Sequence, residues 1–315
     1  MRRLVCLAVL VAATVAVTSA SAGAPDPSGA ATGRALGMVP TWASAMATQW
    51  MNGAYRATYG SGKLYNHGGP TQTTNTTYTI YWAPSNWGQT FPSGYSTLVN
   101  QYFTDVAADS GKTTNVYYTA TQYSGIQYKS TFAGTTTATD ALPASGCSYS
   151  GASVCLTDAQ LQSEINTVIT RNGWPRNGTT EYFLYTAPGV GSCSDSSHCA
   201  FTGYCAYHGW IGSGSTMTTY ANMPYVENVS GCDAGYHPNG LGDATINVTS
   251  HEHNETITDE NGNAWYDLRG YEDGDKCAWS WGAITGNYNQ TINGHHYIAQ
   301  LEYSNADRGC VQSGL

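Results

Sequence analysis

His251 and Glu255 stand four positions apart in this chain of 315 residues, and Glu252 directly follows the histidine. An α-helix turns once in about 3.6 residues, so positions i and i+4 lie on one face, close enough for two side chains to hold one ion. Imidazole and carboxylate groups are both metal ligands in proteins. The spacing therefore predicts a helix, at about residues 243–258, that carries His251 and Glu255 as metal ligands.

The same spacing is typical of the metal helix of zincin hydrolases, in which the residue after the first ligand is a general base. Glu252 is rotated by roughly 100° from His251 around the helix axis, so it would reach a water molecule on the ion rather than the ion. The carboxylate of Glu255 is compatible with zinc but less diagnostic of it, because carboxylates bind many metals. We expect Glu252 to be the catalytic base.

A catalytic zinc ion needs a third protein ligand. Glu272 and Asp275 are the main candidates, because an acid downstream of the metal helix is the gluzincin arrangement. Of the two, Glu272 is preferred. The one that does not bind could orient His251. Asp259 is a rival, although it lies eight positions after His251 and roughly 80° around an ideal helix. It could bind only if the chain bends after the helix.

Other polar residues offer weaker alternatives. His208 could be a fourth ligand or could donate a hydrogen bond to a transition-state oxyanion, but a loop histidine near a disulfide is more often structural. His253 is expected to point away from the His251 face. The helix could also be a hydrogen-bonded polar helix with no metal. Calcium is a further possibility, because it accepts carboxylates and carbonyls; its ligands would be Asp259, Glu272, Asp273 and Asp275.

The first 22 residues have the composition of a secretory signal. Arg2 and Arg3 precede an apolar stretch, and Ala20, Ser21 and Ala22 form a small-residue cleavage site. No later stretch reaches the ~18 consecutive apolar residues of a membrane span. We therefore expect a secreted, extracellular protein with no membrane segment after signal cleavage. Residues 23–63 are expected to be a flexible lead-in or a pro-segment, and residues 64–315 a single folded domain.

Cysteine usage agrees with export. The chain has 9 cysteines, of which Cys6 lies in the expected signal, and the remaining number is even. In an exported protein this favours disulfides over thiolate metal sites. Cys147 with Cys155 is the simplest pair, because it closes a short loop.

Composition limits the partners. Lys and Arg total 12 against 21 Asp and Glu, for a net charge of -9. Nucleic-acid binding needs clustered basic residues, so this class of partner is excluded. The chain also has 24 tyrosines, which suit strands and also carbohydrate contact. The expected partner is a protein or peptide substrate, and a cell-wall polymer is the alternative.

Helical and strand signals alternate along the chain. Thr157 and Gln160 form a capping box at the start of a periodic apolar segment. The fold class is predicted to be α/β or α+β: a zincin-like domain with a mixed sheet, a metal-motif helix and disulfides. The expected strands are residues 76–82, 115–119 and 181–186, and the expected helices before the metal helix are residues 96–108 and 157–169.

Three segments in order resemble a known family. They are Asn66-His67-Gly68-Gly69-Pro70 with Tyr78-Thr79-Ile80-Tyr81-Trp82; Leu156-Thr157-Asp158-Ala159-Gln160-Leu161 with Tyr182-Phe183-Leu184 and Cys205-Ala206-Tyr207-His208; and His251-Glu252-x-x-Glu255 with Asn263-Ala264-Trp265-Tyr266 and Glu272-x-x-Asp275-x-Cys277. From about Tyr65 the chain is similar to the phosphate-induced (EXORDIUM-like) secreted proteins and their bacterial relatives. Glu272 and Asp275 both match the family pattern.

The resemblance implies a fold and a site more than a reaction. Plant members are associated with the cell wall and growth control, and bacterial members are secreted proteins of unassigned activity. Two hypotheses follow. The chain is a secreted zinc-dependent hydrolase, most simply a metallopeptidase. Alternatively, it is a non-enzymatic, cell-wall-associated binding or signalling protein whose metal site is structural or vestigial.

Overall fold

The central sheet is mixed. The structure, a computed structural model, describes residues 37–49, 62–123 and 125–313, and within these ranges six strands join in the order β1-β8-β9-β6-β3-β4. Strands β9, β6, β3 and β4 run parallel, β8 is antiparallel to β9, and β1 is antiparallel to β8. The strands are β1 (Met38–Pro40), β3 (Asn75–Trp82), β4 (Ser130–Ala138), β6 (Thr180–Thr186), β8 (Tyr204–Ile211) and β9 (Thr218–Met223).

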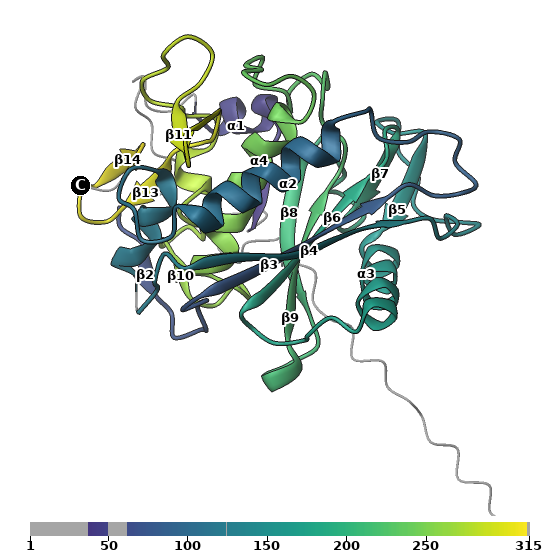
Figure 1. Ribbon diagram of the computed structural model, residues 1–315, viewed down its shortest axis with the longest axis horizontal. Coiled ribbons are helices and arrows are strands. Elements are labelled where there is room, and N and C mark those ends of the chain that lie inside the picture. Colours follow the sequence, from purple (N-terminus) through teal and green to yellow (C-terminus); the bar gives the residue numbers. More distant parts are fainter. Residues whose placement is uncertain (1–36, 50–61, 124, 314–315) are drawn as a thin grey trace, which may run out of the picture.

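Helices cover both faces of this sheet (Figure 1). Successive side chains of a strand point to opposite faces: along β6, Phe183 and Tyr185 pack with α2 (Tyr95–Ala108) and α4 (Asp243–Thr258), whereas Tyr182 and Leu184 pack with α3 (Asp158–Asn172). All seven residues of β6 are buried. A strand covered on both faces has no polar side, which explains the continuous apolar run in its sequence.

The capping box at the start of α3 is confirmed. The Thr157 hydroxyl accepts from the Gln160 backbone N–H, and the Gln160 side chain accepts from the Thr157 N–H. The helix ends at Gly173, whose φ of 63° is in the left-handed region that glycine adopts without strain. The predicted stop at Trp174 and Pro175 was therefore one residue late.

Helix α4 spans residues 243–258, as predicted, and every one of its residues is buried. Its polar side chains find partners on neighbouring elements: Thr245 bonds with Tyr95, Thr249 with Tyr185, and Thr256 with Glu181. Several of its residues are β-branched and favour helix only weakly. Packing on all sides therefore holds this helix in place.

The strand predicted at residues 115–119 is wrong. A 3-10 helix, Val116–Gln122, stands there, and the Asn115 side chain caps it by accepting from the Tyr117 N–H. A short apolar run does not distinguish a strand from a helical turn by periodicity alone. The other predicted elements are confirmed, with each end within three residues of its predicted position. They are the strands at residues 76–82 and 181–186 and the helices at residues 96–108 and 157–169.

Shorter elements connect the layers. In the described ranges these are the helices α1 (Trp42–Gln49), η3 (Gly214–Thr216) and η4 (Asp275–Cys277), and the strand pairs β2 (Tyr65–Asn66) with β10 (Trp265–Tyr266), β5 (Val154–Thr157) with β7 (Val190–Cys193), β11 (Gln290–Ile292) with β12 (His295–Tyr297), and β13 (Glu302–Ser304) with β14 (Gly309–Val311).

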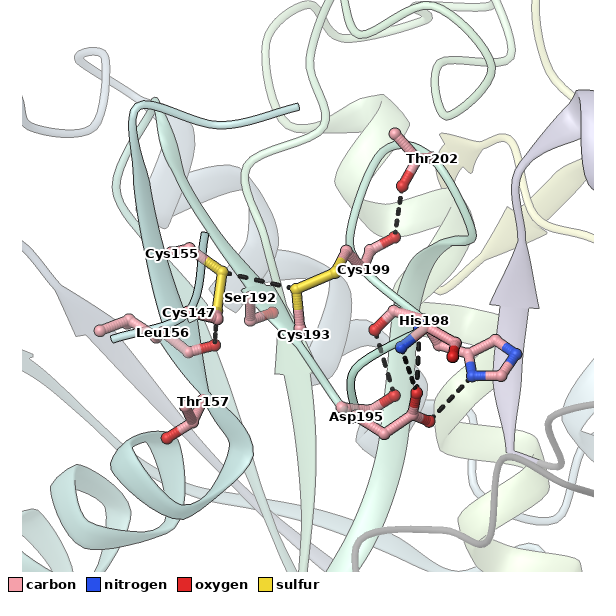
Figure 2. The surroundings of a disulfide bond; sticks show 12 residues. Cys147, Cys155, Leu156, Thr157, Ser192, Cys193, Asp195, His198, Cys199 and Thr202 are labelled. Carbon is pink, nitrogen blue, oxygen red and sulfur yellow. Dashed lines mark hydrogen bonds and ion pairs between the residues drawn. A yellow bond between two sulfur atoms is a disulfide. The ribbon is translucent and has the colours of Figure 1, made fainter. Parts of the chain in front are cut away.

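The eight cysteines of the described ranges form four disulfides. The expected preference for disulfides over thiolate ligands is confirmed, as is the pair Cys147–Cys155. Figure 2 shows this pair beside Cys193–Cys199, with the Cys155 and Cys193 sulfurs 3.5 Å apart. The other two pairs are Cys205–Cys232 and Cys277–Cys310.

The structure describes only part of the N-terminal region whose role was predicted from the sequence. The expected signal, residues 1–22, lies outside the described residues, as do residues 23–36 and 50–61 of the expected lead-in. Residues 37–49 are not a flexible lead-in, because they form β1 and α1, and Met38 and Val39 are buried. In the described part of the chain, no helix is long and apolar enough to cross a membrane.

Glu164 on α3 provides a test of the packing between α3 and its surroundings. Burial, followed by the nearby charge of Asp140, raises the pKa of Glu164 to about 7. The folded-state pKa lies above the unfolded value, so ionisation of Glu164 destabilises the fold as pH rises from about 4.5 to above 7. We expect Glu164→Gln to be more stable than the parent by about 1–2 kcal/mol near pH 8 and equal to it near pH 4. Denaturant unfolding at both pH values measures this, and a pH-independent difference contradicts it.

Candidate functional site

Four segments of the chain meet at the centre of α4. The helix contributes His251, Glu252 and Glu255, and strand β8 contributes His208. The turn before η4 contributes Glu272, and η4 begins with Asp275. The segment entering β13 adds Gln300, which contacts His251. All of these side chains are buried. The structure thus brings together every site residue that the sequence singled out, from positions 208 to 275.

His251 and Glu255 face each other along one side of α4, as their spacing predicted. The His251 Nε2 atom lies 2.9 Å from Glu255 Oε1 and 3.9 Å from Asp275 Oδ1. Glu255 Oε1 also accepts the Asp275 backbone N–H at 2.7 Å. Ligand atoms of these three residues lie within 4.8 Å of one another, so they could hold a metal ion.

The hydrogen bonds around Gln300 define which nitrogen of His251 faces this group. Gln300 Oε1 accepts the Trp279 backbone N–H at 2.8 Å, and the same oxygen lies 3.1 Å from His251 Nδ1. Nδ1 must therefore be the donor, and in the neutral ring the lone pair is on Nε2. A lone pair facing a carboxylate oxygen at 2.9 Å needs a proton or a cation between them.

Gly274 allows the acidic turn to approach α4. A Cβ atom at this position would lie 3.0 Å from the His251 ring and 3.1 Å from Glu255 Oε1. Any larger residue would push the turn away from the helix. This close approach also places the Asp275 N–H against Glu255.

His208 forms a second group on the other side of Glu255. Its Nδ1 atom lies 3.2 Å from Glu252 Oε2 and 3.7 Å from Glu255 Oε2, and its Nε2 atom lies 3.8 Å from Glu272 Oε1. His208, Glu252 and Glu255 also satisfy the distance requirement for a metal ion. The remaining oxygen of Glu252, Oε1, accepts the Val39 backbone N–H at 3.0 Å.

The site buries more acid than base. Burial, followed by the charge of Glu255, raises the pKa of Asp273 to about 7. Burial likewise raises the pKa of Asp259, to about 6. Burial also raises the pKa of Glu252 and, well above its ordinary value, that of Glu302. The buried acids are Glu252, Glu255, Asp259, Glu272, Asp273, Asp275 and Glu302, and the buried bases are His208 and His251.

A concentration of acids like this is stable only if protons or cations neutralise it. Burial opposes the charged form of His251, but Glu255 and the other nearby groups outweigh burial and raise its pKa. The pKa of His208 is raised in the same way, against burial, by Glu252. Lys276 is close in sequence, but its ammonium group bonds with Asp267 at 2.9 Å. The donor set of imidazole and carboxylate therefore fits a metal ion.

Asp259 and Asp273, two members of the alternative calcium set, have hydrogen-bond partners of their own, although their charges act on the site histidines. Asp259 Oδ1 accepts the backbone N–H groups of Asn263 and Ala264, both at 2.7 Å. Asp273 accepts the Thr258 hydroxyl at 2.9 Å. Asp259 thus shapes the turn that follows α4, and the groups of ligand atoms at this site centre on the two histidines instead.

His253 lies away from the site, as expected. Its Nδ1 atom bonds with the Tyr117 hydroxyl at 2.9 Å and its Nε2 atom with Asn75 Oδ1 at 2.7 Å. Burial lowers the pKa of His253 to about 3. This histidine is therefore a neutral part of the core.

Sequence reasoning missed three contributors. Gln300 orients His251. Glu302 has a buried carboxylate near Glu255 and Asp273. Within the described part of the chain, neither oxygen of this carboxylate has a hydrogen-bond partner. Val39 acts through its backbone, which no sequence pattern reveals. Gln300 and Glu302 have no fixed spacing from the helix motif, so only the tertiary structure connects them with it.

Two further groups of possible ligands lie outside this site. Cys147, Cys155 and Cys193 are close together but are bonded in disulfides. Glu227, Asp233 and His237 form a small group in the segment before α4. Neither group contacts the residues that the sequence motif singled out.

Comparison of the chain with protein-family models, curated proteins and solved structures found no match. The resemblance to the phosphate-induced secreted proteins therefore stays a prediction.

We expect metal binding to depend on His251 and not on His253. Chelation should lower the melting temperature of the parent protein by about 5 °C or more, because a bound ion stabilises the folded state. His251→Ala should abolish both the bound metal and the response to chelator. Metal content by mass spectrometry and thermal melts with and without chelator measure these effects.

His253→Gln is the matched control, because it changes a buried histidine on the same helix. It should lose about 1–3 kcal/mol of stability through its broken hydrogen bonds yet keep the metal. If the purified parent carries no metal and does not respond to added zinc, the site is neutralised by protons and the metal prediction is wrong.

Proposed function

We propose that this chain is a secreted, zinc-dependent hydrolase with a zincin-like domain, most simply a metallopeptidase. One observation carries the proposal: a buried carboxylate, Glu252, lies on the same helix as the candidate ligands His251 and Glu255 and within 3.2 Å of a second histidine, His208. The signal-like N-terminus in the sequence and the four disulfides support a location outside the cytoplasm.

His251, Glu255 and Asp275 are the proposed metal ligands. Their ligand atoms group together, and the Gln300 contact leaves the Nε2 lone pair of His251 directed toward the two acids. Glu272 ranks behind Asp275 in this proposal, because its carboxylate faces His208. Two imidazole groups in the site favour zinc over calcium, which takes oxygen ligands.

Glu252 is the proposed general base. Burial raises its pKa above that of an ordinary glutamate, which is the direction that general acid–base catalysis requires. His208, on β8, is the proposed partner: its Nδ1 atom lies 3.2 Å from Glu252 Oε2, and in this proposal it would face the substrate carbonyl. A bound zinc ion would polarise that carbonyl and lower the pKa of a water molecule toward ~7.

Glu252 would then take the proton from the attacking water and deliver it to the leaving amine. His208, whose pKa the surrounding acids raise against burial, would stabilise negative charge that develops on the substrate oxygen. Both roles need side chains that are fixed before the substrate arrives. The short contacts among His208, Glu252 and Glu255 provide that order.

The second candidate function is a non-enzymatic extracellular protein with a structural metal site. The burial of His251, Glu252 and Glu255 favours it, because side chains without solvent access bind a resident ion more readily than they reach a substrate. In that case metal removal would unfold the protein, and no variant of Glu252 would change an activity.

We expect Glu252→Gln to keep the metal and to lower the hydrolysis of an unfolded protein substrate by about 10²–10⁴-fold. The amide cannot accept the proton from water, although it is nearly isosteric. Glu164→Gln is the matched control, because it makes the same change in a buried carboxylate on α3 and should leave activity unchanged. Release of dye from heavily labelled casein, with metal content determined on the same samples, measures the effect. Activity that persists in Glu252→Gln would falsify the hydrolase proposal.

A further inference from the structure

Strand β1 lies beside the proposed catalytic base. It pairs antiparallel with β8, with Met38 opposite Tyr207 and Val39 opposite Ala206. The His208 N–H donates to the Gly37 carbonyl at 3.0 Å, and the Thr41 N–H donates to the Gly203 carbonyl at 3.2 Å. Without β1, strand β8 would be the edge of the sheet.

The backbone of β1 reaches the site itself. The group that does so is the Val39 N–H, at the middle residue of this three-residue strand. It donates to Glu252 Oε1 at 3.0 Å. This oxygen belongs to the group that must accept a proton from water, so the contact occupies the proposed base. The contact uses only a peptide N–H and no side-chain atom of Val39.

The backbone of Gly37 packs against the side chain of His208. Its φ is 62°, and a Cβ atom at this position would lie 2.7 Å from the His208 Cε1 atom. The glycine backbone therefore lies directly against the imidazole ring. Residues 37–39 thus contact both members of the Glu252–His208 pair.

The segment after β1 is held by aromatic side chains. The Trp279 indole N–H donates to the Pro40 carbonyl at 2.8 Å, and Trp42 stacks on Trp281 with their ring centroids 6.4 Å apart. Trp42 is nevertheless 44% exposed. Among residues 37–45, whose burial the structure describes, the buried apolar side chains are Met38, Val39 and Ala45. On its other side, β8 pairs with β9.

From these contacts we infer that the edge of β8 next to Glu252 is a binding site for an extended polypeptide strand, and that residues 37–49 occupy this site within the same chain. The inference rests on the proposed function in taking Glu252 as the reactive group, and it names the substrate class of that function: an unfolded segment of a protein. Strand addition to a sheet edge supplies main-chain hydrogen bonds that do not depend on sequence. Residues 37–49 therefore act as an internal competitor of the substrate.

The test uses the full chain with a recognition sequence for a site-specific protease placed within residues 50–61. After cleavage, a fluorescently labelled synthetic peptide of residues 37–49 is added, and its anisotropy is followed. We expect saturable binding to the cleaved protein, as the labelled peptide replaces the cleaved segment. The uncleaved chain should not bind it, because its own segment is retained by the covalent connection.

The matched control peptide carries N-methylvaline at position 39. It lacks the N–H that donates to Glu252 and should bind about 10-fold more weakly or worse, because hydrogen bonds to charged groups are among the stronger ones. In a second variant, Trp42→Ala in the cleavable chain should accelerate exchange of the segment several-fold. Trp42 is half exposed, so this change does not disturb the core.

Three results would overturn the inference. They are a cleaved segment that never exchanges with excess peptide, a loss of the circular dichroism signal when the segment leaves, and equal binding of the methylated peptide.

Labelled casein separates the inference from the proposed function. If the peptide binds as expected and cleaved protein with bound metal still hydrolyses no casein, the strand site stands and the hydrolase proposal fails. Hydrolysis that is equal before and after cleavage contradicts the competitor role alone.

Discussion

The arrangement of this protein depends on a helix that is buried on all sides and yet carries ionisable groups. Helix α4 lies between the sheet, α2 and the C-terminal segments, and none of its residues is exposed. Charged groups in such a place must be neutralised by one another, by protons or by an ion. The neighbouring segments are built around this requirement: β8 brings a histidine, the segment that enters η4 brings two acids, and Gln300 selects the tautomer of His251.

The same requirement relates stability to function. A buried carboxylate without a partner destabilises the fold, whereas a base for catalysis must give up its partner when the substrate arrives. Glu252 is held here by a backbone N–H and by His208. In the proposed strand site, the N–H of a bound peptide would replace that of Val39 while His208 stays in place, so Glu252 would not become an isolated charge. The core residues Glu181 and His253 behave differently, because their partners are buried side chains of the fold itself. Glu181 accepts from Thr256 on α4, and His253 bonds with side chains of β3 and the 3-10 helix.

Much of the fold followed from local patterns in the sequence. The helix at 243–258, the capping box at Thr157 and the buried strand β6 each have a signal within a few neighbouring residues. The i, i+4 spacing likewise placed His251 and Glu255 on one face. The rest depended on contacts between distant segments. Val39 is 213 residues from Glu252, and Gln300 is 49 residues from His251. The strand wrongly expected at residues 115–119 failed because a side-chain cap at Asn115 outweighed a weak apolar pattern.

The disulfide Cys277–Cys310 joins the end of the acidic turn to β14. Asp275, which approaches His251, lies two residues before Cys277 in the same short 3-10 helix. In a reducing compartment the two thiols remain separate, and this turn is held by noncovalent contacts alone. Oxidation after export would therefore complete the acid side of the site. Under the proposed export and function, the chain would acquire its full ligand geometry only after it had left the proteins of the producing cell.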